Sequence, residues 1–149
     1  MYAKIWYGGI FRKFRESNMN YISTDGGRLE AGYKGRNAGD CGARSVAIAL
    51  QIPYKQAYLE LARTNKEFGF KRSARDGIHK PVFEHFLKKH GWSWRSAPKF
   101  DGRKARCSDL LHGRVIASQA GHYVAVVDGV PHDIWDCSNK MVYGYYAKD

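Results

Sequence analysis

The chain has few of the residues that mark a secreted or membrane-bound protein. It contains three cysteines and four prolines, and no apolar run approaches the roughly 18 residues of a membrane-spanning helix. Three thiols (Cys41, Cys107 and Cys137) cannot all pair with one another, and they lack the close spacing of a zinc site. The first residues have no apolar segment followed by a small-residue cleavage site. We therefore expect a reducing, cytoplasmic location and no metal or organic cofactor.

Acidic residues are also scarce, with 14 Asp and Glu against 25 Lys and Arg, so the formal net charge is +11. Such a surface attracts nucleic acid or an acidic protein, but it does not identify a reaction. The length of 149 residues suits one domain with a usable core. We expect residues 1–18 to form a flexible basic and aromatic arm, and residues 19–149 to form that single domain.

One stretch combines a polar loop with a reactive side chain. Residues 37–42 are mostly small or polar and include Cys41. The mainly apolar residues 43–50 come directly after them. This pattern predicts a buried helix with Cys41 at its start. The unpaired N–H groups and the positive end of the helix dipole favour thiolate there, and thiolate is the attacking form of cysteine. The alternative is a small buried residue with no chemical role.

The rest of the chain separates into helices and then strands. Apolar spacing and prolines at first turns predict helices over about 53–64 and 79–90, with Gly91 ending the second. Four strand-like runs close the chain: Arg114–Gln119, His122–Val127, Pro131–Asp136 and Met141–Tyr146. Asp128-Gly129 is a hairpin signal between two of them. The expected fold class is α+β, with N-terminal helices on a C-terminal antiparallel meander.

A thiolate nucleophile needs an imidazole to share its proton, and His122 is the best placed because it opens an apolar strand. The hairpin at Gly129 then brings a carboxylate beside it. A three-residue loop would oppose His122 with Asp136, our first choice, whereas a two-residue turn would put Asp133 on the same face. Either carboxylate would orient the ring. The alternative interpretation is that His122 only caps the end of a strand and that both aspartates are solvated, without a chemical role.

An acyl intermediate also needs hydrogen-bond donors for its oxyanion. The backbone N–H of Cys41 is one candidate, and the side chain of Asn37 is the other.

The order of these residues resembles that of papain-like cysteine peptidases, and Asp40-Cys41-Gly42 with the Gly121-His122 strand looks most like the C39-like branch. Residues 20–147 are similar to a family of small phage-encoded proteins through seven segments: Thr24-Asp-Gly-Gly-Arg28, Gly32-Tyr-Lys-Gly35, Gly39-Asp-Cys41, Ser73-Ala-Arg75, the strand from His122, His132-Asp-Ile-Trp-Asp-Cys137 and Val142-Tyr-Gly-Tyr145. The resemblance implies a papain-like fold and a triad of Cys41, His122 and Asp136. It also implies a phage protein that works in the host cytoplasm.

The chain departs from that pattern at one position. Papain-like enzymes usually have a glutamine six residues before the cysteine to complete the oxyanion hole, and here that residue is Gly35. The donor is then Asn37 or backbone alone, or hydrolysis is impaired.

We expect a thiol hydrolase that cleaves an amide bond in a protein or peptide, as peptidase or isopeptidase. One alternative is transglutaminase-like transfer of the acyl group to an amine, which proceeds through the same intermediate. Another is a non-catalytic basic module that binds nucleic acid or an acidic host protein. Its candidate residues are two basic clusters and five aromatics: Lys71, Arg72, Arg75, Arg103, Lys104 and Arg106, with Trp92, Trp94, Tyr143, Tyr145 and Tyr146.

Overall fold

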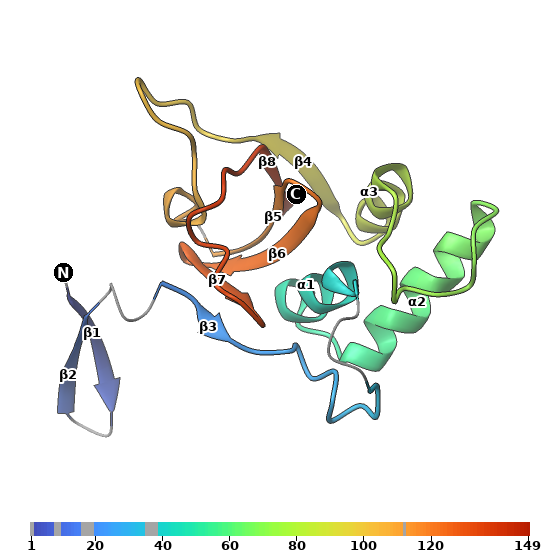
Figure 1. The fold of residues 1–149 in the computed structure, drawn as a ribbon, viewed down its shortest axis with the longest axis horizontal. Coiled ribbons are helices and arrows are strands. Elements are labelled where there is room, and N and C mark those ends of the chain that lie inside the picture. Colours follow the sequence, from blue (N-terminus) through green and yellow to red (C-terminus); the bar gives the residue numbers. More distant parts are fainter. Residues whose placement is uncertain (1, 8–9, 16–19, 35–38, 112) are drawn as a thin grey trace.

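The computed structural model describes residues 2–7, 10–15, 20–34, 39–111 and 113–149 (Figure 1). Its helices are α1 (Cys41–Leu50), α2 (Tyr54–Glu67) and α3 (Lys80–Lys89), with a 3₁₀ turn, η2 (Cys107–Asp109). Its strands are β1 (Tyr2–Tyr7), β2 (Ile10–Arg15), β3 (Ile22–Ser23), β4 (Trp92–Ser96), β5 (Arg114–Gln119), β6 (His122–Val127), β7 (Val130–Asp133) and β8 (Gly144–Lys148). The α+β class expected from the sequence is confirmed.

Six strands form one sheet in the order β3-β7-β6-β5-β8-β4. All neighbours are antiparallel except β3 and β7, which run parallel. The expected meander is therefore wrong in two respects. The chain crosses from β7 past β6 and β5 to reach β8, and β8 is inserted between β5 and β4.

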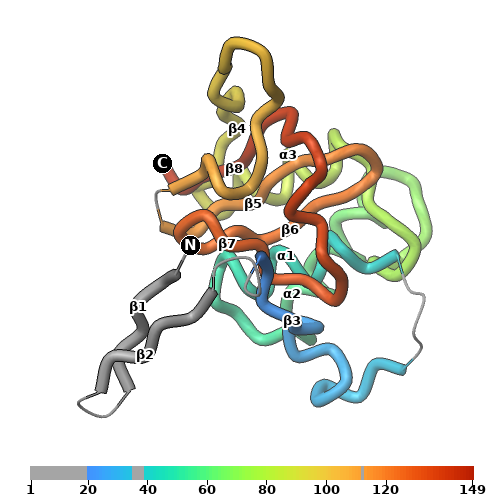
Figure 2. Tube along the Cα trace, turned by 60° about the vertical axis from the view of Figure 1, so that its left-hand side comes forward, coloured from blue at the N-terminus to red at the C-terminus, as the bar shows by residue number. Residues whose placement is uncertain are grey.

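The helix α1 is the centre of the molecule, between the sheet and α2 (Figures 1 and 2). It contacts β5, β6 and β7 on one side and α2 on the other. The start of the helix packs beside α3 and the loop before it: a Cβ added at Gly42 would make ordinary van der Waals contacts with the ring of Phe83 at 3.4 Å and with Ile78 at 3.5 Å. The almost continuous burial of α1 matches its apolar sequence. The cysteine at its start is thereby held in a fixed position over the sheet.

The other two helices are amphipathic and cover the core from the opposite side. In α2, Ala57 and Leu61 are buried, and α3 buries Val82, Phe83 and Phe86. These helices begin and end within about three residues of the predicted boundaries. They position the loop 68–79, which leads back to the neighbourhood of Cys41.

The hairpin that joins β6 and β7 determines which carboxylate reaches His122. Asp128 and Gly129 both have positive φ, 48° and 83°, as a two-residue type I′ turn requires. The register pairs Val127 with Val130 and Ala125 with His132. A two-residue turn therefore joins these strands, and the three-residue loop is wrong.

The strands β1 and β2 form a separate two-stranded antiparallel sheet, with Tyr2 opposite Arg15 and Tyr7 opposite Ile10. Both strands lie within residues 1–18, the region that was expected to form an arm separate from the main domain. No helix among the described residues is long and apolar enough to cross a membrane.

Candidate active site

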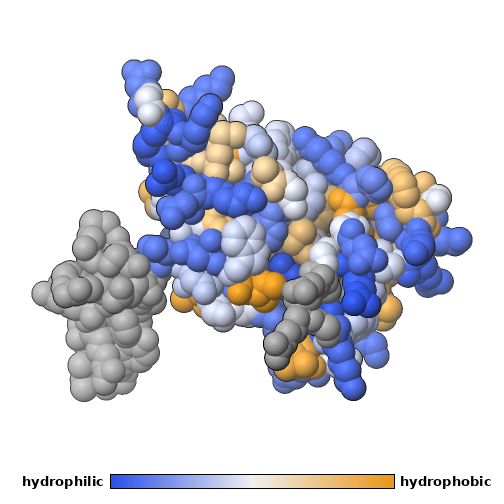
Figure 3. All heavy atoms as spheres, viewed as in Figure 1, coloured by the Kyte–Doolittle hydropathy of each residue, from blue (hydrophilic) through white to orange (hydrophobic). Residues whose placement is uncertain are grey.

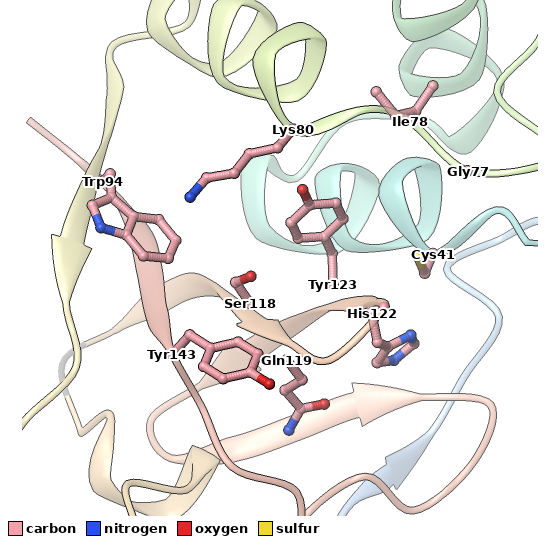
Figure 4. Close-up of a pocket in the computed structure, with 11 residues that line it drawn as sticks. Cys41, Gly77, Ile78, Lys80, Trp94, Ser118, Gln119, His122, Tyr123 and Tyr143 are labelled. Carbon is pink, nitrogen blue, oxygen red and sulfur yellow. The ribbon is translucent and has the colours of Figure 1, made fainter.

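Cys41 is the first residue of α1, and its sulfur lies beside the imidazole of His122 (Figure 4). Burial raises the pKa of the thiol, but hydrogen bonds from His122 and from the backbone N–H of Tyr123 lower it. The positive charges of His122 and Arg44 act in the same direction, so the pKa of Cys41 falls below its ordinary value. The expected meeting of Cys41 and His122 is present, and its environment favours thiolate.

The other side of the His122 ring is held by Asp133. The Nε2 atom of His122 lies 2.5 Å from Oδ2 of Asp133, and both side chains are buried. Because Asp133 occupies Nε2, Nδ1 is the ring nitrogen available to Cys41. Burial lowers the pKa of His122, but hydrogen bonds to Asp133, Cys137 and Cys41 raise it well above its ordinary value. This environment stabilises an imidazolium between a carboxylate and a sulfur.

The carboxylate beside His122 is thus Asp133, the reserve choice, and not Asp136. The side chain of Asp136 is exposed and accepts hydrogen bonds from the backbone N–H (3.0 Å) and the hydroxyl (2.5 Å) of Ser138. The two-residue turn explains the outcome, since it puts Asp133 and His122 on one face of adjacent strands. Asp133 ends β7, and Asp136 lies three residues beyond it, after the bend at Ile134 and Trp135.

Arg44 connects α1 to this carboxylate, and the sequence argument missed it. Its guanidinium is buried, lies 3.3 Å from Asp133 and also pairs with Asp40. The Asp40 carboxylate in turn accepts a hydrogen bond from the hydroxyl of Tyr54 (2.6 Å) and lies 3.4 Å from Arg28. An arginine within an otherwise apolar helix was the available signal, because a buried guanidinium requires a buried partner.

Cys137 is also buried, and its thiol lies 3.8 Å from Asp133 Oδ2. Its hydrogen bond with Cys107 and its burial raise the pKa of Cys137, so this thiol stays protonated. His122, Asp133 and Cys137 each offer a metal-ligating atom within 4.8 Å of the others. Two ligands of a tetrahedral zinc ion are separated by about 3.3 Å, however. The 2.5 Å contact of His122 and Asp133 fits a direct hydrogen bond instead.

Trp135 covers the imidazole from the solvent side. Its ring centroid is 5.0 Å from that of His122, and 41% of the residue remains exposed. The ammonium of Lys140 lies over the outer part of the same indole, 5.5 Å from the centroid. An apolar ring in this place limits the access of water to the buried imidazole. The sequence argument did not select this residue.

The start of α1 also offers donors for an oxyanion. The N–H groups of Cys41 and Gly42 precede the first i→i−4 bonds of the helix, and Asp40 makes no side-chain cap to them. Asn37, the candidate side-chain donor, lies outside the described residues, as does Gly35.

A cleft of about 440 Å³ opens beside Cys41 and His122 (Figure 4). Its wall on the side of the sheet is formed by Ser118, Gln119 and Tyr123, and its far end by Trp94 and Tyr143. Lys80, at the start of α3, reaches over it. The sulfur of Cys41 is therefore at one end of a cavity large enough for part of a peptide.

Two of the residues proposed for nucleic-acid binding are buried. Trp92 and Tyr146 belong to the core, with 5% and 1% exposure. Arg103 is engaged by Asp109 through two hydrogen bonds of 2.9 Å. Figure 3 shows hydrophilic side chains spread over the loop after β4 and over the helical side of the molecule. Two of the five aromatic residues named in that hypothesis are therefore not exposed for stacking on nucleic-acid bases.

Comparisons of the chain with protein-family models, with curated proteins and with solved structures gave no match.

Proposed function

We propose that this protein is a thiol hydrolase that cleaves an amide bond through an acyl-enzyme, with Cys41 as nucleophile, His122 as acid and base, and Asp133 as the orienting carboxylate. The observation that carries the proposal is the buried imidazole of His122, shared between a sulfur at a helix start and a carboxylate. That arrangement is typical of nucleophilic catalysis by cysteine, including the papain-like peptidases.

In the first half-reaction the Cys41 thiolate attacks the carbonyl carbon, and a sulfur–carbon bond forms as the carbonyl π electrons move to oxygen. The backbone N–H groups of Cys41 and Gly42 stabilise this oxyanion. When the carbonyl re-forms, the carbon–nitrogen bond breaks, and His122 gives its proton to the leaving amine. The product is a thioester on Cys41 and a free amine.

In the second half-reaction His122 accepts a proton from water as the water oxygen attacks the thioester. The carbon–sulfur bond then breaks, a carboxylic acid leaves, and the thiolate–imidazolium pair is restored. Asp133 keeps Nε2 protonated throughout, so Nδ1 is the atom that exchanges the proton. An amine in place of water would make the protein an acyl transferase by the same steps.

The experiment is reaction with p-nitrophenyl acetate, an activated acyl donor that needs no specific recognition. We expect a burst of nitrophenolate equal to the protein concentration, and an acetyl group on Cys41 in the intact mass and peptide map. Cys41→Ser and His122→Ala should each remove the burst. A burst that survives both substitutions, or an acetyl group on another residue alone, would refute the proposal.

The same experiment identifies the acceptor. Added methylamine should yield N-methylacetamide above the amount formed with Cys41→Ser for an acyl transferase, and no more than that amount for a hydrolase, because methylamine also reacts directly with the ester.

A further inference from the structure

The cleft that leads away from Cys41 has one cationic side chain besides the catalytic imidazole, and no acidic one among the described residues that line it. The cation is Lys80, whose ammonium lies 4.6 Å from the centroid of the Trp94 ring. Its side chain is 58% exposed, and the nearest carboxylate oxygen, of Glu84, is 4.0 Å away. Lys80 thus keeps a positive charge directed into the cleft with only a loose partner.

The aromatic walls on either side of this charge differ in how firmly they are held. The ring of Trp94 lies flat against Gly144, where an added Cβ would come within 2.2 Å of it. It also meets the ring of Tyr146 edge to face at a centroid distance of 5.0 Å. Tyr143, by contrast, is 52% exposed. Trp94 is therefore a fixed wall, and Tyr143 is a half-exposed wall across the cleft from it (Figure 4).

Hydroxyl groups complete the lining between Lys80 and the reactive pair. The Tyr123 ring stacks on Phe83 at a centroid distance of 4.2 Å, and its hydroxyl points into the space between Lys80 and Cys41. Burial and the charges of Cys41 and Glu84 raise the pKa of Tyr123 to about 12, so the phenol keeps its proton and can donate. An ammonium and a phenol beside aromatic walls fit an anion carried on an apolar stem.

We propose that this cleft binds a carboxylate-bearing side chain of the substrate next to the bond that is cleaved, with the stem between Trp94 and Tyr143 and the carboxylate against Lys80. The substrate class is then an acidic protein or peptide segment, in keeping with the net charge of +11. The inference rests on the proposed thiol hydrolase, because it assumes that Cys41 is the reacting atom.

The test uses two alkylating agents that differ only in charge, 4-(iodoacetamido)benzoate and its neutral analogue 4-(iodoacetamido)benzamide. Each is attacked by the Cys41 sulfur at the CH₂ carbon with loss of iodide, which tethers the ring where the cleft begins. The normalised ratio is the benzoate-to-benzamide ratio of alkylation rates for Cys41, divided by the same ratio for glutathione. At 150 mM NaCl we expect it to be on the order of five.

Substitution of the cation supplies the decisive comparison. Lys80→Met should lower the normalised ratio to the small preference that the overall charge alone gives, and Lys80→Glu should lower it further. Lys88→Met is the matched control, since Lys88 is exposed on the same helix and does not line the cleft. It should keep the wild-type ratio. A ratio that is the same in wild type, Lys80→Met and Lys80→Glu would overturn the proposal.

That failure can be told apart from a failure of the hydrolase itself. If Cys41 reacts with the neutral reagent faster than glutathione does at pH 7, but charge preference is absent, then the activated thiol stands and the acidic substrate class falls. If Cys41 reacts with both reagents no faster than glutathione, the proposed function falls and takes this inference with it.

Discussion

At the scale of single residues, the imidazole of His122 lies between two groups with different tasks. In the proposed mechanism the Cys41 sulfur exchanges a proton with it, while Asp133 holds the ring and stays ionised. Burial raises the pKa of Asp133, but the hydrogen bond and charge of His122 and the charge of Arg44 lower it below its ordinary value. The two carboxylates near the end of β7 are therefore chemically different, although they are three positions apart.

A pair of substitutions separates these carboxylates. Asp133→Asn removes the charge beside the ring, so the imidazolium loses stability and the Cys41 thiol pKa rises. We expect the rate of Cys41 alkylation by iodoacetamide at pH 7 to fall by on the order of tenfold or more. Asp136→Asn should leave it within about twofold. Equal effects of the two substitutions, measured by mass spectrometry across pH 5–10, would contradict the assignment.

The same ring should make stability depend on pH. The pKa of His122 is raised above its ordinary value of 6.5, so its contribution is full below pH 6.5 and is lost as pH rises through the folded-state value. The pKa of Asp133 is lowered from 3.8, so its contribution is present above that pH and is lost as pH falls through the folded-state value. Both are complete between about pH 4 and 6.5.

Urea unfolding of Cys41→Ser and Cys41→Ser/His122→Gln measures this dependence without the thiolate. The difference in free energy of unfolding between the two proteins should be largest in that window and should shrink toward pH 10. A difference that grows with pH would mean that His122 is neutral in the folded protein.

At the scale of elements, the helix α1 and the strand β7 are joined by one buried cation. Arg44 pairs with Asp40 at the start of α1 and with Asp133 at the end of β7. Because both carboxylates are buried, removal of the guanidinium would leave two negative charges without adequate compensation. Arg44 thus couples the position of Cys41 to the position of the carboxylate that orients His122.

Arg44→Met tests this coupling. We expect the free energy of unfolding at pH 7 to fall by about 3 kcal/mol, because a buried ion pair that loses one partner is strongly destabilising. Arg63→Met, an exposed arginine on α2, is the matched control and should cost less than about 0.5 kcal/mol. Urea titrations followed by circular dichroism provide both numbers. Similar losses in the two variants would show that Arg44 is not the link.

Local patterns predicted most of the elements. The spans of β5 and β6 agree with the predicted runs, and apolar periodicity located the three helices to within about three residues. Each of these signals is a pattern of apolar and polar side chains that are close together in the sequence. The meeting of Cys41 with His122 followed from their positions at the ends of such elements.

Features set by distant contacts were not predictable in the same way. The insertion of β8 between β5 and β4 depends on a crossover that no local pattern encodes. The choice between Asp133 and Asp136 depended on one residue of turn length, which left both open. Arg44 was missed because its partner, Asp133, is far from it in the sequence. Trp135 was missed because its partner, His122, lies on β6.

At the scale of the whole molecule, the excess of positive charge acts over a longer range than any single contact. The formal net charge of +11 is the difference between 25 basic and 14 acidic residues, so the loss of Lys80 lowers it only to +10. Long-range attraction of an anion should therefore survive that substitution and disappear with salt.

Salt titration separates the two ranges. In wild type and in Lys80→Met alike, we expect the benzoate-to-benzamide ratio of alkylation rates to fall several-fold between 20 and 500 mM NaCl, as surface charges are screened. The residual preference at 500 mM should be confined to the wild type, where Lys80 contacts the anion directly. A ratio that does not change with salt would show that the overall charge does not steer anions to the cleft.

The indole of Trp135 against the imidazole of His122 has a practical consequence. A protonated imidazole quenches indole emission more than a neutral one does, so the fluorescence of this tryptophan reports the ionisation of the ring beneath it. The difference between the spectra of wild type and Trp135→Phe isolates that signal from those of the remaining tryptophans. The molecule thus contains its own optical indicator, and proton movements at the centre can be followed in real time without a label.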